Sequence, residues 1–141
     1  MASVFTMIID GDLPARFVWR DEVCVGFLSI NPLAPGHTLV VPRREVDHWL
    51  DLDAATLAHV VEVGRTIGAA LQAEFDPVKV GLIVAGLEVP HVHLHLVPIR
   101  SERDLEFANA ERTPDPAALD AAAAAIRRRL TSAGRTEVAD A

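Results

Sequence analysis

The sequence predicts an α+β fold in which a small antiparallel sheet is covered by one long helix and followed by a C-terminal helix. Short runs rich in β-branched and aromatic residues alternate with turn-forming residues, and one long stretch carries apolar residues at helical spacing. The chain has 141 residues, half of them hydrophobic, which predicts a single domain over residues 1–132. Residues 133–141 are expected to form a flexible tail.

The N-terminal half begins with a short helical or irregular segment over residues 3–14, which Gly11 and Pro14 end. Three β-rich runs follow, separated by turn compositions: 17–19, 23–30 and 37–41. Short strands joined by short turns predict an antiparallel meander.

A long amphipathic helix is predicted over residues 54–74, with Asp53 as its N-cap, and we expect it to cover one face of the sheet. A fourth strand over residues 78–84 then turns tightly into a fifth over 90–98, so these two strands should form an antiparallel hairpin.

The segment after the hairpin, residues 101–116, is polar and is expected to be irregular. A last helix should begin at Asp115-Pro116, because an N-cap residue is followed there by proline, and should run through Leu130.

Composition limits the classes of function. The formal net charge is −7, which argues against binding of nucleic acids, whose phosphates require clustered Lys and Arg. No apolar run is long enough for a membrane helix, and no signal peptide is apparent, so the sequence predicts a soluble, cytoplasmic protein. The single cysteine, Cys24, lies between valines in a predicted strand and is expected to be a buried thiol.

Histidines 91, 93 and 95 alternate with large apolar residues in the fifth predicted strand. Because successive side chains of a strand point to opposite faces, the three imidazoles should share one face while Val92 and Leu94 enter the core. Imidazole titrates near neutral pH and is rare on a solvated strand, so this face predicts a functional site. His48 and His59 lack such a pattern and are expected to be surface residues.

Two chemistries suit this pattern. In the first, an i, i+2 pair of histidines chelates a metal ion, with His37 or Glu88 as a third ligand, although one straight strand cannot easily bring all three rings to one ion. In the second, the central ring, His93, attacks phosphorus while its neighbours neutralise the phosphate oxygens. The second chemistry requires the other nitrogen of His93 to donate a hydrogen bond to a carbonyl that fixes the tautomer.

The stretch His91-Val92-His93-Leu94-His95-Leu96-Val97 resembles the signature of the histidine triad (HIT) superfamily. Residues 5–14 and 35–43 also resemble the N-terminal segment and the central strand of that family. The resemblance implies a five-stranded antiparallel sheet, a homodimer, and hydrolysis at the α-phosphate of a nucleotide through a histidine-nucleotidyl intermediate. A histidine at position 95 indicates the Hint- and Fhit-like hydrolase branch, and residues 83–90 and 107–109 resemble a divergent bacterial branch of it.

The resemblance also implies roles for individual residues. His93 is the expected nucleophile, His91 and His95 contact phosphate and relay protons, and His37 belongs to the same network. The residues expected to contact the nucleotide are Phe5, Ile8, Leu13, Phe27, Ser29, Ile30, Glu88 and Val89. The implied ligand is a small AMP- or GMP-containing molecule, with no cofactor and no metal.

Departures from the family pattern accompany this likeness. Ser29 stands where many members have an Asp that holds the ribose hydroxyls, Leu87 replaces a Gln, and Glu88 puts a carboxylate where it would repel phosphate. Several members bind zinc through two cysteines and a histidine at positions that here carry Ser3, Thr6 and Glu45, so that zinc site is expected to be absent.

The intact histidines favour a nucleotide hydrolase or phosphoramidase that releases a nucleoside monophosphate. The altered residues leave open a nucleotide-binding module with little turnover, and a metal-binding histidine site is the third alternative.

Overall fold

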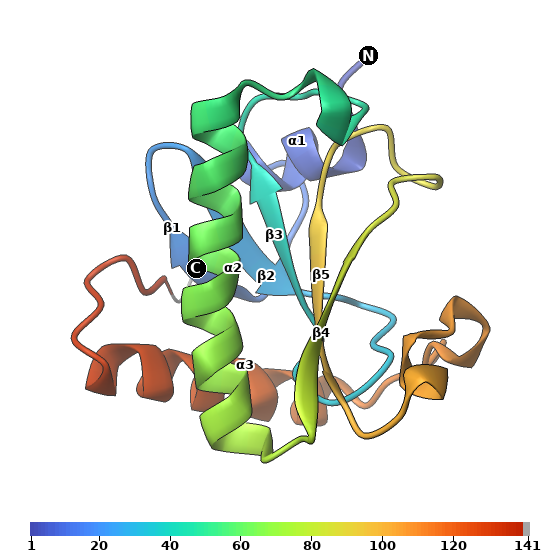
Figure 1. The fold of residues 1–141 in the computed structure, drawn as a ribbon, viewed down its shortest axis with the longest axis vertical. Helices are drawn as coiled ribbons and strands as arrows, with labels where there is room; N and C mark the ends of the chain where they lie inside the picture. The colour runs from blue at the N-terminus through green and yellow to red at the C-terminus, as the bar shows by residue number, and fades with distance from the viewer. Residues whose placement is uncertain (140–141) are drawn as a thin grey trace.

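The computed structural model describes residues 1–139 and contains one five-stranded antiparallel sheet with the strand order β1-β2-β3-β5-β4 (Figure 1). The strands are β1 (Phe17–Arg20), β2 (Cys24–Leu28), β3 (Thr38–Pro42), β4 (Lys79–Val84) and β5 (Leu94–Ile99). The helices are α1 (Val4–Ile9), α2 (Ala54–Phe75) and α3 (Pro116–Ser132), with short 3₁₀ turns η1 (Trp49–Asp51), η2 (Glu102–Leu105) and η3 (Phe107–Asn109). The predicted α+β class and five-stranded sheet are confirmed.

Helix α2 lies along one face of the sheet, and α3 crosses behind the lower part of α2 in this view (Figure 1). The core between α2 and the sheet contains Ile67 and Leu71 from the helix and Leu94 and Leu96 from β5, all at most 3% exposed. Burial of such side chains stabilises the fold by roughly 1.5–3 kcal/mol each. Leu94 and Leu96 are the apolar residues that alternate with the histidines, so core packing fixes which face of β5 the imidazoles occupy.

The connection between β4 and β5 is longer than the sequence suggested. Val84 pairs with Leu94, so residues 85–93 form a loop outside the paired strands. The predicted strand over 90–98 therefore begins only at Leu94, because β3 pairs with β5 no further than Val40 opposite Leu94. The amide of Val92 donates instead to the carbonyl of Val46, at 2.8 Å.

The segment after α3 returns to the sheet as far as the structure describes it. Val138 forms an isolated antiparallel bridge with Trp19, and the amide of Arg20 donates to the carbonyl of Glu137 at 2.9 Å. The Nε of Arg127 donates to the carbonyl of Ala139 at 3.1 Å. Residues 133–139 of the expected tail are therefore docked against β1, and residues 140 and 141 lie outside the described residues.

Across the described part of the chain, no helix combines the length and the apolar character that crossing a lipid bilayer requires.

Candidate active site

The triad imidazoles form a row on the face of the sheet opposite α2. The ring centroids of His93 and His95 are 4.8 Å apart, and the ring of His37, from the residue before β3, lies 5.2 Å from that of His95. Phe5 of α1 packs edge-on against His91 at 5.9 Å and against His93 at 4.8 Å. The structure thus brings together all four histidines predicted for the site, although His91 and His93 precede β5 and lie in the loop.

The tautomer of His93 follows from its hydrogen bond. Its Nδ1 lies 2.7 Å from the backbone carbonyl of His91, and a carbonyl can only accept, so Nδ1 carries the proton. In the neutral ring the lone pair is then on Nε2. No residue in the described part of the chain hydrogen-bonds to this nitrogen, and His93 lines two cavities. His93 is only 6% exposed, yet its free nitrogen borders open space.

His37 and His95 form a directed hydrogen-bonded pair. The backbone amide of Leu33 donates to Nδ1 of His37 at 2.9 Å, which leaves the ring proton of His37 on Nε2. That Nε2–H donates to Nδ1 of His95, also at 2.9 Å. A neutral His95 therefore keeps its own proton on Nε2, where it can be donated to a ligand.

His91 is fully buried and is held at both ring nitrogens. Its Nε2–H donates to the carbonyl of Pro42 at 2.7 Å, so Nδ1 accepts from the hydroxyl of Ser3, also at 2.7 Å. These two bonds fill the hydrogen-bonding capacity of the ring. In the free protein His91 is therefore a structural neighbour of His93.

Burial keeps the histidines neutral. Burial, followed by the charge of His93, lowers the pKa of His37 to about 4, and burial with the neighbouring His93 and His37 lowers the pKa of His95 to about 3. Burial also lowers the pKa of His93. At neutral pH each ring therefore presents one donor and one acceptor, as the hydrogen bonds above require.

Acid should destabilise the protein through this pair. In the unfolded chain histidine titrates near pH 6.5, whereas folded His37 and His95 resist protonation, so stability is full above about pH 6.5 and falls as the pH drops toward their folded pKa values. Each of these two histidines should lower the free energy of unfolding by about 1.4 kcal/mol between about pH 7.5 and pH 5.5. Denaturant titrations at both pH values should show a smaller loss for His95→Gln than for wild type, whereas His48→Gln, at an exposed position, should lose as much as wild type.

Two cavities meet at His93. The larger is an apolar cavity of about 280 Å³, and the smaller, about 170 Å³, lies between His95 and the loop residues 85–88. His93, Glu88 and Phe107 line both. An apolar pocket that opens beside an unpaired imidazole nitrogen suits a ligand with a flat apolar part and a reactive polar part.

Most of the residues predicted to contact the nucleotide line the larger cavity: Phe5, Ile8, Phe27, Ser29, Ile30, Glu88 and Val89. Leu13 is not among the described lining residues, and its neighbour Pro14 takes that place, because the chain turns after α1.

A third wall of the site, which the sequence did not predict, comes from the segment after β5. Phe107, Ala110 and Arg112 line the larger cavity, and the ring of Phe107 lies 5.2 Å from that of His95. This polar, irregular segment gave no periodic signal. The sequence likeness over residues 107–109 was its only indication.

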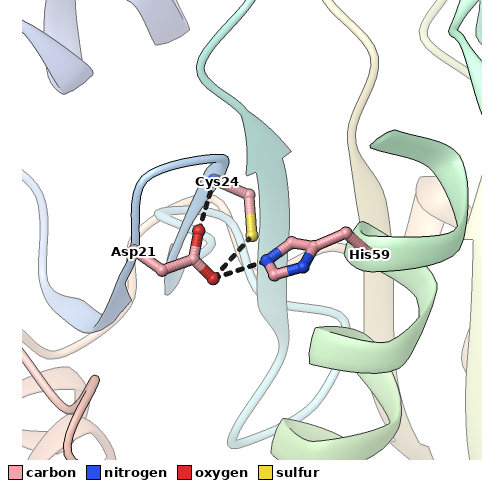
Figure 2. A group of neighbouring side chains, drawn as sticks. All are labelled: Asp21, Cys24 and His59. Atoms are coloured by element: carbon pink, nitrogen blue, oxygen red, sulfur yellow. Dashed lines mark hydrogen bonds and ion pairs between the residues drawn. The ribbon is translucent and has the colours of Figure 1, made fainter. Parts of the chain in front are cut away.

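The metal alternative is not supported by the geometry. The Nε2 of His91 and the Nδ1 of His93 each donate to a backbone carbonyl, and the Nε2 of His37 donates to Nδ1 of His95. These nitrogens are therefore not available as ligands of a shared metal ion. In the described part of the chain, only Asp21, Cys24 and His59 place three ligand-type atoms within 4.8 Å of one another (Figure 2).

The Asp21 cluster is explained by hydrogen bonding. The Oδ1 atom accepts from the amides of Val23 and Cys24, and Oδ2 accepts from the indole of Trp19 at 2.8 Å and from His59 at 2.7 Å. Figure 2 shows the bonds from Cys24 and His59. These bonds lower the pKa of Asp21 to about 2 against the opposing effect of burial. Asp21 therefore joins the turn between β1 and β2 to helix α2.

Two residues of the cluster were considered in the sequence. His59, expected to be a surface residue, is partly exposed and pairs with Asp21, because α2 lies over the β1–β2 turn. Cys24 is fully buried, as expected, and burial together with the neighbouring Asp21 raises the pKa of its thiol, so the thiol is a poor nucleophile.

Comparisons with known proteins identify relatives of this chain. The sequence model of the HIT domain matches residues 10–102. An uncharacterized HIT-like protein of Methanocaldococcus jannaschii is 37% identical over 107 residues, which cover 73% of this chain and 82% of the relative. The bis(5'-nucleosyl)-tetraphosphatase (asymmetrical) of Schizosaccharomyces pombe is 30% identical over 107 residues, covering 70% of this chain and 59% of that enzyme.

Among solved structures, a zinc-bound histidine triad family protein of Mycobacterium smegmatis is 30% identical to this chain and has a TM-score of 0.81. The match covers 95% of this chain and 96% of that protein. With its four-histidine row, its fold and these matches, the chain belongs to the HIT family, the histidine triad superfamily of nucleotide-binding hydrolases.

Proposed function

We propose that the protein hydrolyses a small adenylated or guanylated compound at the α-phosphate through a covalent intermediate on His93. The observation that carries this proposal is the Nε2 of His93, which has a lone pair and no hydrogen-bond partner in the described part of the chain while Nδ1 donates to a carbonyl, on a ring that lines two cavities. We expect the base to occupy the larger, apolar cavity, which Phe5 and Phe27 line, with the phosphate beside His93 and the leaving group in the smaller cavity.

The reaction consists of two displacements at phosphorus. In the first, Nε2 of His93 forms a bond to phosphorus, and the bond from phosphorus to the leaving group breaks. The leaving group takes a proton from Nε2 of His95. In the second, water attacks phosphorus, the bond to His93 breaks, and the proton of the water returns to His95, so a nucleoside monophosphate is released.

The His37–His95 pair must hold an additional proton to act as the acid, because a neutral ring that gave up its only proton would become an anion. The negative phosphate supplies the reason, since an opposite charge nearby raises the pKa of both rings and counteracts the effect of burial. The bound substrate thus loads the pair with the proton that the leaving group needs. Because Nδ1 of His37 and Nδ1 of His95 both accept hydrogen bonds in the free protein, this proton replaces one of those two bonds.

Glu88 favours one class of leaving group. Its carboxylate lines both cavities beside His93 and therefore attracts a cationic leaving group and repels an anionic one. An adenylated amine such as adenylated lysine fits this charge, whereas a polyphosphate, the kind of leaving group implied by the name of the S. pombe relative, does not.

A substrate panel tests the proposal. Release of AMP should be fastest from adenylated lysine, intermediate from adenosine 5'-phosphoramidate and slowest from a diadenosine polyphosphate, as measured by chromatography at one ionic strength. Binding of AMP without release from any of the three compounds would instead identify a nucleotide-binding module.

We also propose that the protein is a homodimer that pairs through β4 and α2. Strand β4 is an edge of the sheet, and Leu82 on it is 53% exposed beside an apolar groove with Gly64, Gly68 and Val61 of α2. An open apolar edge of this kind is unfavourable in a monomer.

The dimer proposal predicts a twofold monomer mass in sedimentation equilibrium. Leu82→Lys should give the monomer mass, since a charge at the groove opposes pairing, whereas Leu50→Lys, at another exposed leucine, should leave the mass unchanged. A monomeric wild type at working concentration would contradict the proposal.

A further inference from the structure

A chain of hydrogen bonds leads from a surface carboxylate to the nucleophile. Glu45, which follows β3, accepts through Oε1 from the backbone amide of Ser3 at 2.6 Å and from the hydroxyl of Thr6 at 2.7 Å. These hydrogen bonds lower the pKa of Glu45 to about 2, so the carboxylate is ionised across the range in which histidines titrate. The carboxylate thereby ties the start of the chain to the end of the central strand.

Ser3 occupies the next position in this chain of bonds. It is 8% exposed, and its hydroxyl accepts from the amide of Thr6 at 3.0 Å, which makes it the N-cap of α1. The same hydroxyl donates to Nδ1 of buried His91 at 2.7 Å. Ser3 therefore fixes both the first turn of α1 and the ring of His91.

Both of the elements held by Ser3 contact His93. The carbonyl of His91 accepts the Nδ1–H that fixes the tautomer of His93, and α1 carries Phe5, whose ring lies 4.8 Å from that of His93. A displacement of either one would turn the attacking nitrogen away from phosphorus, and misplacement by about 1 Å can cost about a hundredfold in rate.

We propose that Ser3 and Glu45 are positioning residues that hold the tautomer and the ring orientation of His93 through His91 and α1. The expected effect on turnover rests on the proposed function, whereas the expected effect on the tautomer and orientation of the His93 ring does not. Neither residue lines either cavity at His93, so neither is expected to touch the substrate.

The test compares two helix N-caps. Ser3→Ala removes the cap of α1 together with the hydrogen bond to His91, whereas Asp53→Ala removes the cap of α2, where Asp53 accepts from the amide of Thr56 at 3.0 Å. Turnover of adenosine 5'-phosphoramidate gives kcat and KM, and nitrogen-15 NMR of the imidazoles reports the protonated nitrogen of His93 without any turnover.

We expect Ser3→Ala to lower kcat about 10- to 100-fold at an unchanged KM. This is the size of effect seen when a metal-binding histidine loses the hydrogen bond that orients its ring. The proton of the neutral His93 ring should then be found partly on Nε2, instead of wholly on Nδ1. Ser3→Thr, which keeps the hydroxyl, should restore both properties, and Asp53→Ala should lower the melting temperature while leaving kcat and the tautomer at wild-type values.

The inference is overturned if Ser3→Ala keeps the wild-type kcat and His93 tautomer and loses only thermal stability. If Ser3→Ala does not fold, Glu45→Gln decides, since it alters an exposed side chain and should lower kcat severalfold; an unchanged kcat and tautomer would then refute the inference. If wild type turns over no substrate, the proposed function fails, and the tautomer in the variants alone supports or overturns the positioning role.

Discussion

His93→Ala should lower the hydrolysis of adenosine 5'-phosphoramidate by at least three orders of magnitude, roughly the effect of removing a covalent nucleophile. The variant loses Nε2 of His93, which carries a lone pair and has no hydrogen-bond partner in the described part of the chain, on a ring that lines both cavities. Steady-state release of AMP measures the effect. The KM should change much less than kcat, because the apolar cavity still holds the base.

The control for this variant is His48→Ala, which removes an exposed histidine that caps η1 and takes no part in the site. It should retain wild-type turnover. Comparable slow hydrolysis by wild type and His93→Ala across the substrate panel would mean that the ring does not attack phosphorus.

His95→Ala should show a loss that depends on the leaving group. Departure of an amine requires a proton, which we assign to Nε2 of His95, so turnover of adenylated lysine should fall about 10²- to 10⁴-fold. A p-nitrophenyl ester of AMP releases an anion that needs no proton, and its hydrolysis should fall far less. Initial rates for both substrates, measured on the same preparation, give the comparison.

Equal losses on both leaving groups would contradict the role of His95 as the acid and would indicate that its ring mainly holds the phosphate. His37→Ala provides a second test, because His37 donates to Nδ1 of His95 at 2.9 Å and should show the same dependence to a smaller degree.

The sequence predicts the fold well where periodicity and packing agree. Leu94 and Leu96 alternate with the histidines and are buried against α2, so the face that carries the histidines could be inferred before the structure. Helix α2 ends at Phe75, one residue beyond the predicted range of 54–74. It ends there because Asp76 adopts a left-handed conformation and Pro77 then prevents continuation.

The sequence is less informative where tertiary contacts decide the structure. The strand of the triad begins at Leu94 rather than position 90, because β3 offers no partner beyond Val40. Residues 133–139 return to β1 through backbone bonds to Val18 and Arg20, which composition cannot indicate. The wall formed by Phe107 and Arg112 depends on how an irregular segment folds back over the site.

Hydrogen bonds link Glu45 through Ser3 to His91. Ser3 lies 42 positions from Glu45 and 88 positions from His91 in the sequence, so no local pattern marks this link. The family likeness pointed to Ser3, Thr6 and Glu45 only as places where other members bind zinc. The structure instead joins these three residues by hydrogen bonds to one another and to the triad.

The most direct test is to identify the residue that carries the nucleotide during turnover. Wild-type protein quenched in alkali while it hydrolyses adenosine 5'-phosphoramidate should carry one adenylyl group, and peptide mapping by mass spectrometry should place it on His93. Label on another residue, or AMP release with no labelled protein at any time in a rapid-quench series, would contradict a two-step reaction at this imidazole.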